Sequence, residues 1–361
     1  MRLVFLGLSL SSSWGNGHAT TYRALLRALD ARGHEVLFLE REQPWYAAHR
    51  DLPKPDFCAL RFYDSLAELD RHAPDVAQAD AVIIGSYVPE GADVIDRIAP
   101  DARTLFCFYD IDTPVTMHAL AQGGVGYLRA EQIRLFDLYL SFTGGPTLRV
   151  LEREYGARLA RPLYCTVDPA RHRPIPMPRR WDLGYLGTYS PDRQPALERL
   201  LIEPARRCPD LRFAVAGPLY PDTIDWPGNV ERIEHLSPLD HTTFYASQAW
   251  TLNVTRADMR QRGYSPSVRL FEAGACGTPV VSDSWPGLDT LFLPGRDILV
   301  AHTAQDVLDA LDLPEERRGA IARAGRKRVL GCHTAETRAR ELEEFLSEAR
   351  IRSDIIEGAQ A

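Results

Sequence analysis

The sequence predicts an α/β protein with two domains, each built on a parallel sheet that is covered by helices on both faces. Three observations favour this fold class. The chain has 361 residues, whereas single hydrophobic cores stop growing at about 250–300 residues. Short apolar runs alternate with helical patterns along most of the chain, which is typical of doubly wound parallel sheets. A proline-rich stretch divides this alternation into two series.

The first series opens with a strand–helix–strand unit. The apolar run over 2–10 predicts a buried strand, residues 18–32 carry apolar side chains at helical spacing, and 34–40 predicts the next strand. Gly33 stands where a helix commonly ends. Because the two strands are joined through a helix, they form a parallel βαβ unit. Further strands of this series are expected at 80–86, 104–110 and 138–143.

The division lies at 169–181, where four prolines occur in thirteen residues. Proline at that density ends regular structure and stiffens the chain. We therefore expect a first domain over 1–172, a linker over 173–181 and a second domain over 182–334. The strands of the second domain are expected at 182–187, 211–217, 229–234, 249–254, 278–283 and 297–300. Its helices are expected near 193–207, 239–247 and 267–276.

Charge and composition exclude several classes of function. The 42 basic and 49 acidic residues give a net charge of −7. Both signs are spread along the chain, so we expect no basic surface for nucleic acid or anionic lipid. The six cysteines are scattered singly without a CxxC pair, which favours reduced thiols in the cytoplasm over a zinc site or a disulfide framework. No apolar run reaches the roughly 18 residues of a membrane span, so no integral membrane segment is expected.

The segment with the strongest functional signal is SPSVRLFEAGACGTPVVSD, at the start of 265–300. Its expected helix carries Arg269 and Glu272 three residues apart, on neighbouring faces. The following Gly-Thr-Pro step ends the helix and turns into an apolar strand. This segment resembles the nucleotide-sugar-binding signature of GT-B glycosyltransferases. It resembles more closely the CgeB-like branch, which is related to glycosyltransferase families 1 and 4.

The resemblance covers most of the chain, because further segments match in order and at the right spacing. These segments are LYCTVDPARHRP at 163–174, YLGTYSPDRQPALERLL at 185–201, VAGPLYP at 215–221 and a helical stretch at 316–346. The resemblance implies a GT-B fold, with two Rossmann-like domains facing across a cleft. It also implies transfer of a sugar from a nucleoside diphosphate donor, a UDP- or dTDP-sugar, to an acceptor hydroxyl. A charged C-terminal helix, about 335–361, is expected to pack back on the first domain.

The resemblance assigns the donor to the second domain. Glu272 matches the glutamate that accepts hydrogen bonds from the ribose hydroxyls, a task that suits an acceptor-only carboxylate. Arg193 and Arg269 are candidates for the diphosphate because guanidinium forks match phosphate oxygens; a solvated salt bridge explains each of them equally well. Ser265 and Ser267 stand where helix amides cradle phosphate, or they serve as a plain N-cap.

Three glycines complete the expected donor site, and one position departs from the family pattern. The glycines belong to the matching segments and are Gly187, Gly217 and Gly277. Relatives in family 4 carry a second glutamate eight residues before the ribose glutamate, near the transferred sugar. Here that position is Tyr264. The E-x7-E pair is absent, so the resemblance leaves open whether the reaction inverts or retains the sugar's configuration.

A glycine-rich loop, Gly15-Asn16-Gly17-His18, separates the first expected strand from its helix. In GT-B enzymes such a loop lets the backbone approach the acceptor and the donor phosphate. His18 resembles the histidine that many inverting GT-B enzymes use as a general base, and an imidazole titrates near the working pH of most enzymes. A capping or structural role explains His18 as well.

Two carboxylates follow the expected strand at 104–110, in FYDIDTP, and reach the same edge of the sheet. Asp110 or Asp112 would orient His18 or act as the base itself, and spacing does not choose between them. Asp112 also fits an Asx-turn before Thr-Pro. An Asp-x-Asp metal signature belongs to the GT-A architecture, so we expect no metal and no cofactor besides the nucleotide-sugar donor.

Other classes of function share this frame. A non-hydrolysing nucleotide-sugar epimerase and a non-catalytic nucleotide-sugar-binding or morphogenetic protein are the alternatives. A dehydrogenase is disfavoured because the first loop lacks G-x-G-x-x-G, and Glu40 at the end of the second strand is weak support for it. The aromatic stretch at 41–55 fits acceptor binding and ordinary packing equally. The sequence leaves open the acceptor, the donor's base and sugar, and the oligomeric state.

Overall fold

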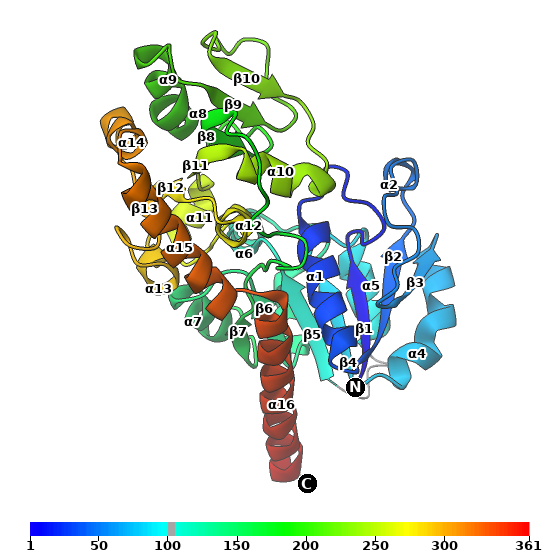
Figure 1. Ribbon diagram of the computed structural model, residues 1–361. Helices are drawn as coiled ribbons and strands as arrows, with labels where there is room; N and C mark the ends of the chain where they lie inside the picture. The colour runs from blue at the N-terminus through cyan, green and yellow to red at the C-terminus, as the bar shows by residue number, and fades with distance from the viewer. Residues whose placement is uncertain (100–104, 361) are drawn as a thin grey trace. The chain divides into compact units, whose positions relative to one another are not determined.

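The computed structural model describes residues 1–99 and 105–360. The chain divides into two compact units, one of residues 1–165 with 335–361 and the other of residues 166–334. Each unit is built on one parallel sheet, and Figure 1 shows the strands and helices of both. No helix among the described residues is long and apolar enough to cross a membrane.

The sheet of the first unit has seven strands, all parallel, in the order β3-β2-β1-β4-β5-β6-β7. Chain order reverses between β1 and β4, and ligands of doubly wound sheets bind outside the carboxyl ends of the strands at such a point. The strands are β1 (Arg2–Gly7), β2 (Glu35–Arg41), β3 (Ala59–Tyr63), β4 (Ala81–Gly85), β5 (Leu105–Asp110), β6 (Leu138–Ser141) and β7 (Ala160–Pro162).

Helices cover both faces of this sheet. They are α1 (His18–Ala31), α2 (Pro44–Ala47), α3 (Leu66–Leu69), η1 (Asp70–His72), α4 (Ala73–Ala77), α5 (Gly91–Ile98), α6 (Thr113–Ala121), η2 (Ala130–Leu135), α7 (Pro146–Arg153) and α16 (Ala335–Gln360). The C-terminal helix α16 lies against α1, as Figure 1 shows. Glu343 on α16 accepts hydrogen bonds from Arg32 and pairs with His34, just after α1.

The sheet of the second unit repeats the same winding with six parallel strands, in the order β10-β9-β8-β11-β12-β13. Its reversal of chain order lies between β8 and β11. The strands are β8 (Trp181–Leu186), β9 (Phe213–Ala216), β10 (Val230–Ile233), β11 (Gln248–Asn253), β12 (Val280–Ser282) and β13 (Leu299–Val300). Buried Leu183, Tyr185, Val215, Trp250 and Leu252 fill its core.

The helices of the second unit include α12, which carries the strongest sequence motif. Ser267 caps its N-terminus and Gly277, with φ +77°, ends it in the left-handed conformation that favours glycine. The helices are α8 (Gln194–Leu197), η3 (Glu198–Ile202), α9 (Glu203–Arg207), η4 (Pro238–Asp240), α10 (His241–Ala246), α11 (Ala257–Arg262), α12 (Val268–Cys276), α13 (Leu288–Leu291), α14 (Ala304–Leu311) and α15 (Glu315–Cys332).

The expected fold class of two doubly wound parallel sheets is confirmed. The strand expected at 104–110 is β5, and Thr104 lies outside the described residues. The strand expected over 2–10 is shorter in the structure: β1 ends at Gly7, and residues 8–10 begin the loop. Strands β3 and β7 were missed because each lies at an edge of the sheet, and β3 alternates exposed with half-buried residues.

Candidate functional site

His18 and Asp112 meet at the carboxyl edge of the first sheet. His18 is the first residue of α1, which follows β1, and Asp112 follows β5. The His18 Nε2 atom lies 3.5 Å from Asp112 Oδ2. The His18 side chain keeps 27% of its surface exposed and that of Asp112 keeps 8%. A partly exposed imidazole is able to accept a proton, and a nearly buried carboxylate beside it is able to orient the ring.

Asp110 does not share this position, although it is only two residues away. It is fully buried, and its carboxylate accepts hydrogen bonds from the Tyr139 hydroxyl at 2.6 Å and the Thr116 hydroxyl at 2.8 Å. Burial raises the pKa of Asp110 to about 6, against the opposing effect of these hydrogen bonds. Of the two candidate carboxylates, the structure therefore brings Asp112 to His18 and places Asp110 in the core.

Asp110 should make the stability of the protein fall as the pH rises. Its pKa is 3.8 in the unfolded chain and about 6 in the folded protein, so the folded state binds the proton more tightly. The stabilisation is complete below pH 3.8 and is lost as the pH rises through 6, a change of about 3 kcal/mol. Urea unfolding at pH 5 and 7.5 gives the free energy of unfolding at each pH. This free energy should change less between the two pH values in Asp110→Asn than in the exposed control Asp289→Asn. Equal slopes would contradict this expectation.

Tyr87 is a further residue of this site, and the sequence analysis missed it. It follows β4, on the other side of the switch point from β1, and its hydroxyl donates to Asp112 Oδ2 at 2.9 Å. Its ring centroid lies 6.1 Å from that of His18, with 20° between the planes. The sequence offered one signal for Tyr87: the residue comes directly after the strand expected at 80–86, where side chains reach the carboxyl edge of the sheet.

The glycine-rich loop before α1 is held by Asn16. The Asn16 side chain is buried; its Nδ2 donates to Ser9 O at 3.0 Å and its Oδ1 accepts from the His18 N–H at 3.1 Å. Gly15 has φ +60°, in the left-handed region. A Cβ atom added at Gly15 or Gly17 would meet nothing within 4 Å. The loop therefore leaves open space beside its glycines, while Asn16 positions the start of α1.

Glu40, at the end of β2, belongs to the same loop. Its two carboxylate oxygens accept four hydrogen bonds, from the hydroxyls of Ser9 and Ser11 and from the backbone N–H groups of Leu10 and Ser11, at 2.6–2.9 Å. In dinucleotide-binding enzymes an acidic residue at this strand end binds the ribose of the cofactor. Here the carboxylate is buried and committed to the loop, which argues against the dehydrogenase alternative.

In the second unit, Arg269 lies at the switch point between β8 and β11. It is buried; its Nε donates to Leu186 O at 2.6 Å, where β8 ends, and its Nη1 donates to Asn253 Oδ1 at 2.7 Å, where β11 ends. Ser267 Oγ lies 3.4 Å from Arg269 Nη1, and Ser265 is buried close to the start of the same helix. Arg269 therefore joins the ends of two strands and brings positive charge to the carboxyl edge.

Arg193 adds a second positive charge at this edge. Its Nη2 donates to Thr188 O at 2.5 Å, and its buried Nε has no hydrogen-bond partner in the described part of the chain. Thr188 follows Gly187, where a Cβ atom would lie 2.9 Å from Arg269 Nη2. A Cβ atom at Gly217 would lie 2.2 Å from Gly187 O. The two glycines are therefore required by close packing, and the two arginines converge on residues 186–188.

Glu272, one turn beyond Arg269 on α12, is surrounded by polar groups from two other segments. Its carboxylate lies 3.3 Å from His241 Nδ1 and 3.7 Å from His172 Nε2, and it accepts from the Tyr245 hydroxyl at 3.2 Å. Burial opposes the charge, but the two histidines lower the pKa of Glu272 to about 2. Glu272 is therefore ionised at neutral pH and only 2% exposed.

The sequence analysis missed both histidines around Glu272. His172 stands in the quoted segment 163–174 and His241 opens the helix expected near 239–247, but nothing in their spacing pointed to Glu272. The ligand atoms of His172, His241 and Glu272 lie within 4.8 Å of one another. Imidazole nitrogens with a carboxylate oxygen are a donor set that zinc accepts in proteins, so this cluster is a place among the described residues that is able to hold a metal.

Tyr264 occupies a strained turn before α12. Its φ is +51°, its N–H donates to Pro286 O at 2.6 Å, and its ring packs on Gly287 so closely that a Cβ atom there would lie 2.4 Å from the ring. The position that carries a glutamate in family 4 relatives is thus filled by an aromatic side chain that packs on a neighbouring turn.

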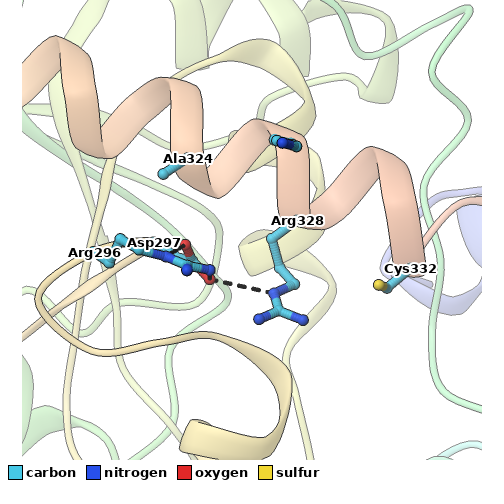
Figure 2. Close-up of a pocket in the computed structure, with 6 residues that line it drawn as sticks. Arg296, Asp297, Ala324, Arg328 and Cys332 are labelled. Carbon is cyan, nitrogen blue, oxygen red and sulfur yellow. Dashed lines mark hydrogen bonds and ion pairs between the residues drawn. The ribbon is translucent and has the colours of Figure 1, made fainter.

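A separate cavity of about 480 Å³ lies between α15 and the turn before β13. Figure 2 shows Arg296 and Arg328 converging on Asp297, whose carboxylate lies 2.8 Å from Arg296 Nε and 3.2 Å from Arg328 Nε. Its lining residues are Arg296, Asp297, Ala324, Lys327, Arg328 and Cys332. None of the residues expected to bind donor or acceptor lines it, so it is distinct from the candidate site.

Two doubly wound parallel sheets in one chain, with polar residues at the carboxyl edges of both, define the GT-B class of fold. Residues 193–344 match the glycosyl transferase-like family and include Arg193, Arg269 and Glu272. No curated protein matches the sequence. The CgeB-like branch of the resemblance remains an expectation.

Solved structures of the same class match nearly the whole chain. Sucrose-phosphate synthase from Thermosynechococcus elongatus is 14% identical, with a TM-score of 0.68 over 96% of this chain and 98% of its own. HepE of Anabaena, solved with UDP and glucose, is 14% identical, with a TM-score of 0.69 over 96% and 100%. An alpha-glucosyltransferase solved with UDP and a DNA 13-mer is 14% identical, with a TM-score of 0.73 over 96% and 98%. At these identities the likeness establishes the fold.

Proposed function

We propose that the protein is a glycosyltransferase that moves a sugar from a nucleoside diphosphate donor to an acceptor hydroxyl. The observation that carries this proposal is the convergence of Arg193 and Arg269 at the carboxyl edge of the second sheet, one helical turn from ionised Glu272. Guanidinium groups suit a diphosphate, and a carboxylate suits the ribose hydroxyls. All three residues lie in the glycosyl transferase-like segment.

The donor we propose is a UDP-sugar, with a dTDP-sugar as the alternative. HepE and the alpha-glucosyltransferase were both solved with UDP, and their folds match this chain. In this proposal the second unit binds the donor and the first unit binds the acceptor. His18 then accepts the proton of the acceptor hydroxyl, and Asp112 orients the imidazole and stabilises the positive charge that forms on it.

The transfer should not require a metal ion, because two arginines are available to stabilise the leaving diphosphate. We expect full activity after treatment with EDTA and buffer exchange, with the metal content of the same sample measured by mass spectrometry. Activity that is lost on chelation and restored by zinc or magnesium would overturn this expectation. His172, His241 and Glu272 would then be the first residues to substitute.

The decisive test is a binding screen of the purified protein against UDP, dTDP, GDP and their sugar conjugates, with NAD as the control. A ligand present at 100 times its Kd stabilises the folded state by about 2.7 kcal/mol, which thermal unfolding detects readily, and calorimetry then gives the affinity. Binding of one nucleoside diphosphate but not NAD supports the proposal. Binding without any release of sugar would favour the non-catalytic alternative, and the absence of binding would refute a donor site.

A further inference from the structure

A chain of hydroxyl groups lies behind the His18–Asp112 pair in the first unit. The Tyr87 hydroxyl donates to Asp112 at 2.9 Å, and the Tyr87 and Tyr127 ring centroids lie 4.8 Å apart. The Tyr127 hydroxyl lies 2.8 Å from that of Thr116, which donates to Asp110 at 2.8 Å. The chain of contacts therefore runs from the partly exposed imidazole of His18 to the fully buried carboxylate of Asp110.

The backbone at Tyr87 is held in an unfavourable conformation. Its φ is +66°, in the left-handed region that bulky residues rarely adopt. The segment is fixed by Ser86, whose N–H donates to Tyr109 O at 3.0 Å and whose hydroxyl accepts from the Ile111 N–H at 3.1 Å. Strained residues that the surrounding structure holds in place cluster at active sites. In this strained conformation the Tyr87 hydroxyl reaches Asp112.

The geometry around Asp112 gives this contact a specific effect. One oxygen, Oδ2, faces both the Tyr87 hydroxyl at 2.9 Å and His18 Nε2 at 3.5 Å. The neighbouring rings of Tyr87 and Phe142 have centroids 6.1 and 6.3 Å from that of His18. With Oδ2 held toward Nε2, the imidazole is favoured in the tautomer that carries its proton on Nε2. The unprotonated Nδ1 is then the atom able to accept a proton.

The Tyr87 hydroxyl holds its proton more tightly than an ordinary tyrosine does. Burial and the neighbouring Asp112 carboxylate raise the pKa of Tyr87 far above its ordinary range. The charged groups that face this cluster are Asp110 from the end of β5, Asp112 from the turn that follows and His18 from α1. Tyr87 therefore keeps its proton at a pH at which an ordinary tyrosine begins to lose it, and its hydroxyl remains able to donate to Asp112.

We propose that Tyr87 is a positioning residue for the general base: its hydroxyl holds Asp112 in the orientation that fixes the tautomer of His18. This inference rests on the proposed function only for its kinetic consequence, because the tautomer exists whether or not the protein transfers a sugar. Removing the hydroxyl should lower kcat about tenfold while the donor KM stays unchanged, since Tyr87 acts through Asp112 and His18.

The test compares Tyr87→Phe with wild type by ¹⁵N NMR of histidine-labelled protein and by the rate of UDP release from UDP-glucose. The wild type should show the Nε2–H tautomer for His18, and the variant should show a mixture. Tyr127→Phe, one contact further away, should give a smaller change. Tyr22→Phe is the matched control, because the Tyr22 hydroxyl is buried without a hydrogen-bond partner in the described part of the chain.

The outcomes separate this inference from the proposed function. An unchanged tautomer and kcat in Tyr87→Phe would overturn the positioning role. The positioning role would also be overturned if Tyr22→Phe changed the tautomer and kcat as much as Tyr87→Phe does. The change would then follow from removing any buried tyrosine hydroxyl near the site, whether or not it contacts Asp112. A wild type that shows the Nε2–H tautomer but binds no UDP and releases none from UDP-glucose would refute the proposed function and leave the positioning role intact. Thermal unfolding of each variant confirms that folded proteins are compared.

Discussion

Replacing His18 with alanine should lower kcat by about 10²–10⁴-fold while the affinity for the nucleotide stays unchanged. This is the usual contribution of a general acid–base residue. His18 lies in the first unit at the start of α1, and its side chain is 27% exposed, beside the rings of Tyr87 and Phe142. The substitution should therefore remove the proton acceptor without unfolding the protein. Steady-state release of UDP measures kcat, and calorimetry with UDP measures binding.

His118→Ala is the matched control for this experiment, because His118 is an exposed histidine on α6 of the same unit. It should retain wild-type turnover. Asp112→Asn should fall between the control and His18→Ala, since it keeps the shape of the side chain but removes the charge that stabilises the imidazolium. Near-normal turnover in His18→Ala would remove His18 from the mechanism and leave Asp112 as the candidate base.

Replacing Glu272 with glutamine should weaken UDP binding about 10- to 100-fold. Hydrogen bonds to a charged group contribute about 1.5–3 kcal/mol each, and the proposed contact is with the ribose hydroxyls. The test is a comparison of UDP with 2′-deoxy-UDP in wild type and variant. The wild type should prefer UDP, and the preference should shrink in Glu272→Gln, because the missing hydroxyl and the missing carboxylate belong to one interaction. Equal affinity of wild type and variant for UDP would exclude Glu272 from the ribose site.

Glutamine is preferred to alanine here because Glu272 also contributes to stability. Its pKa falls from 4.5 in the unfolded chain to about 2 in the folded protein, chiefly through His172 and His241 against the cost of burial. The stabilisation is therefore present above pH 4.5 and is lost as the pH falls toward 2. Binding is best measured at pH 7, with exposed Glu315→Gln as the control.

The fold was predictable from the sequence because most of the strands are central. A strand buried on both faces of a parallel sheet is a continuous apolar run, and β1, β4 and β5 all show this pattern. Edge strands lack it: in β3, Arg61 and Ala59 alternate with less exposed neighbours. Periodicity therefore identified the centre of each sheet and missed both edges of the first one.

The candidate site was predictable only as far as the edge of the sheet. Strand ends placed His18, Asp110 and Asp112 at one edge, but the chain turns after Asp110, so the two carboxylates reach different environments. Sequence spacing carries no information about that turn. Tyr87 and His241 contact Asp112 and Glu272 across 25 and 31 residues respectively. Contacts over such separations depend on how the helices pack, which a single sequence does not reveal.

Arg269 has a structural role in addition to the phosphate-binding role that we propose for it. The sequence offered it as a ligand for phosphate, whereas the structure shows its guanidinium donating to Leu186 and Asn253 at the ends of β8 and β11. These hydrogen bonds fix the orientation of the buried Arg269 guanidinium. Substituting Arg269 would therefore disturb the strand ends as well as any bound diphosphate, so Arg193 is the cleaner position at which to examine charge.

The hydrogen bonds that Glu40 accepts from the loop after β1 have a consequence for ligand entry. Flexible loops lose conformational entropy when a ligand orders them, and that loss weakens binding. Here Ser9, Leu10 and Ser11 are already held by hydrogen bonds to the side chain of Glu40. A ligand that binds at this end of the first sheet would contact a preorganised loop. The entropy lost on binding would then come mainly from the ligand and not from the loop. The start of the loop after β1 is thus held by a side chain of the neighbouring strand β2 and needs no ligand to order it.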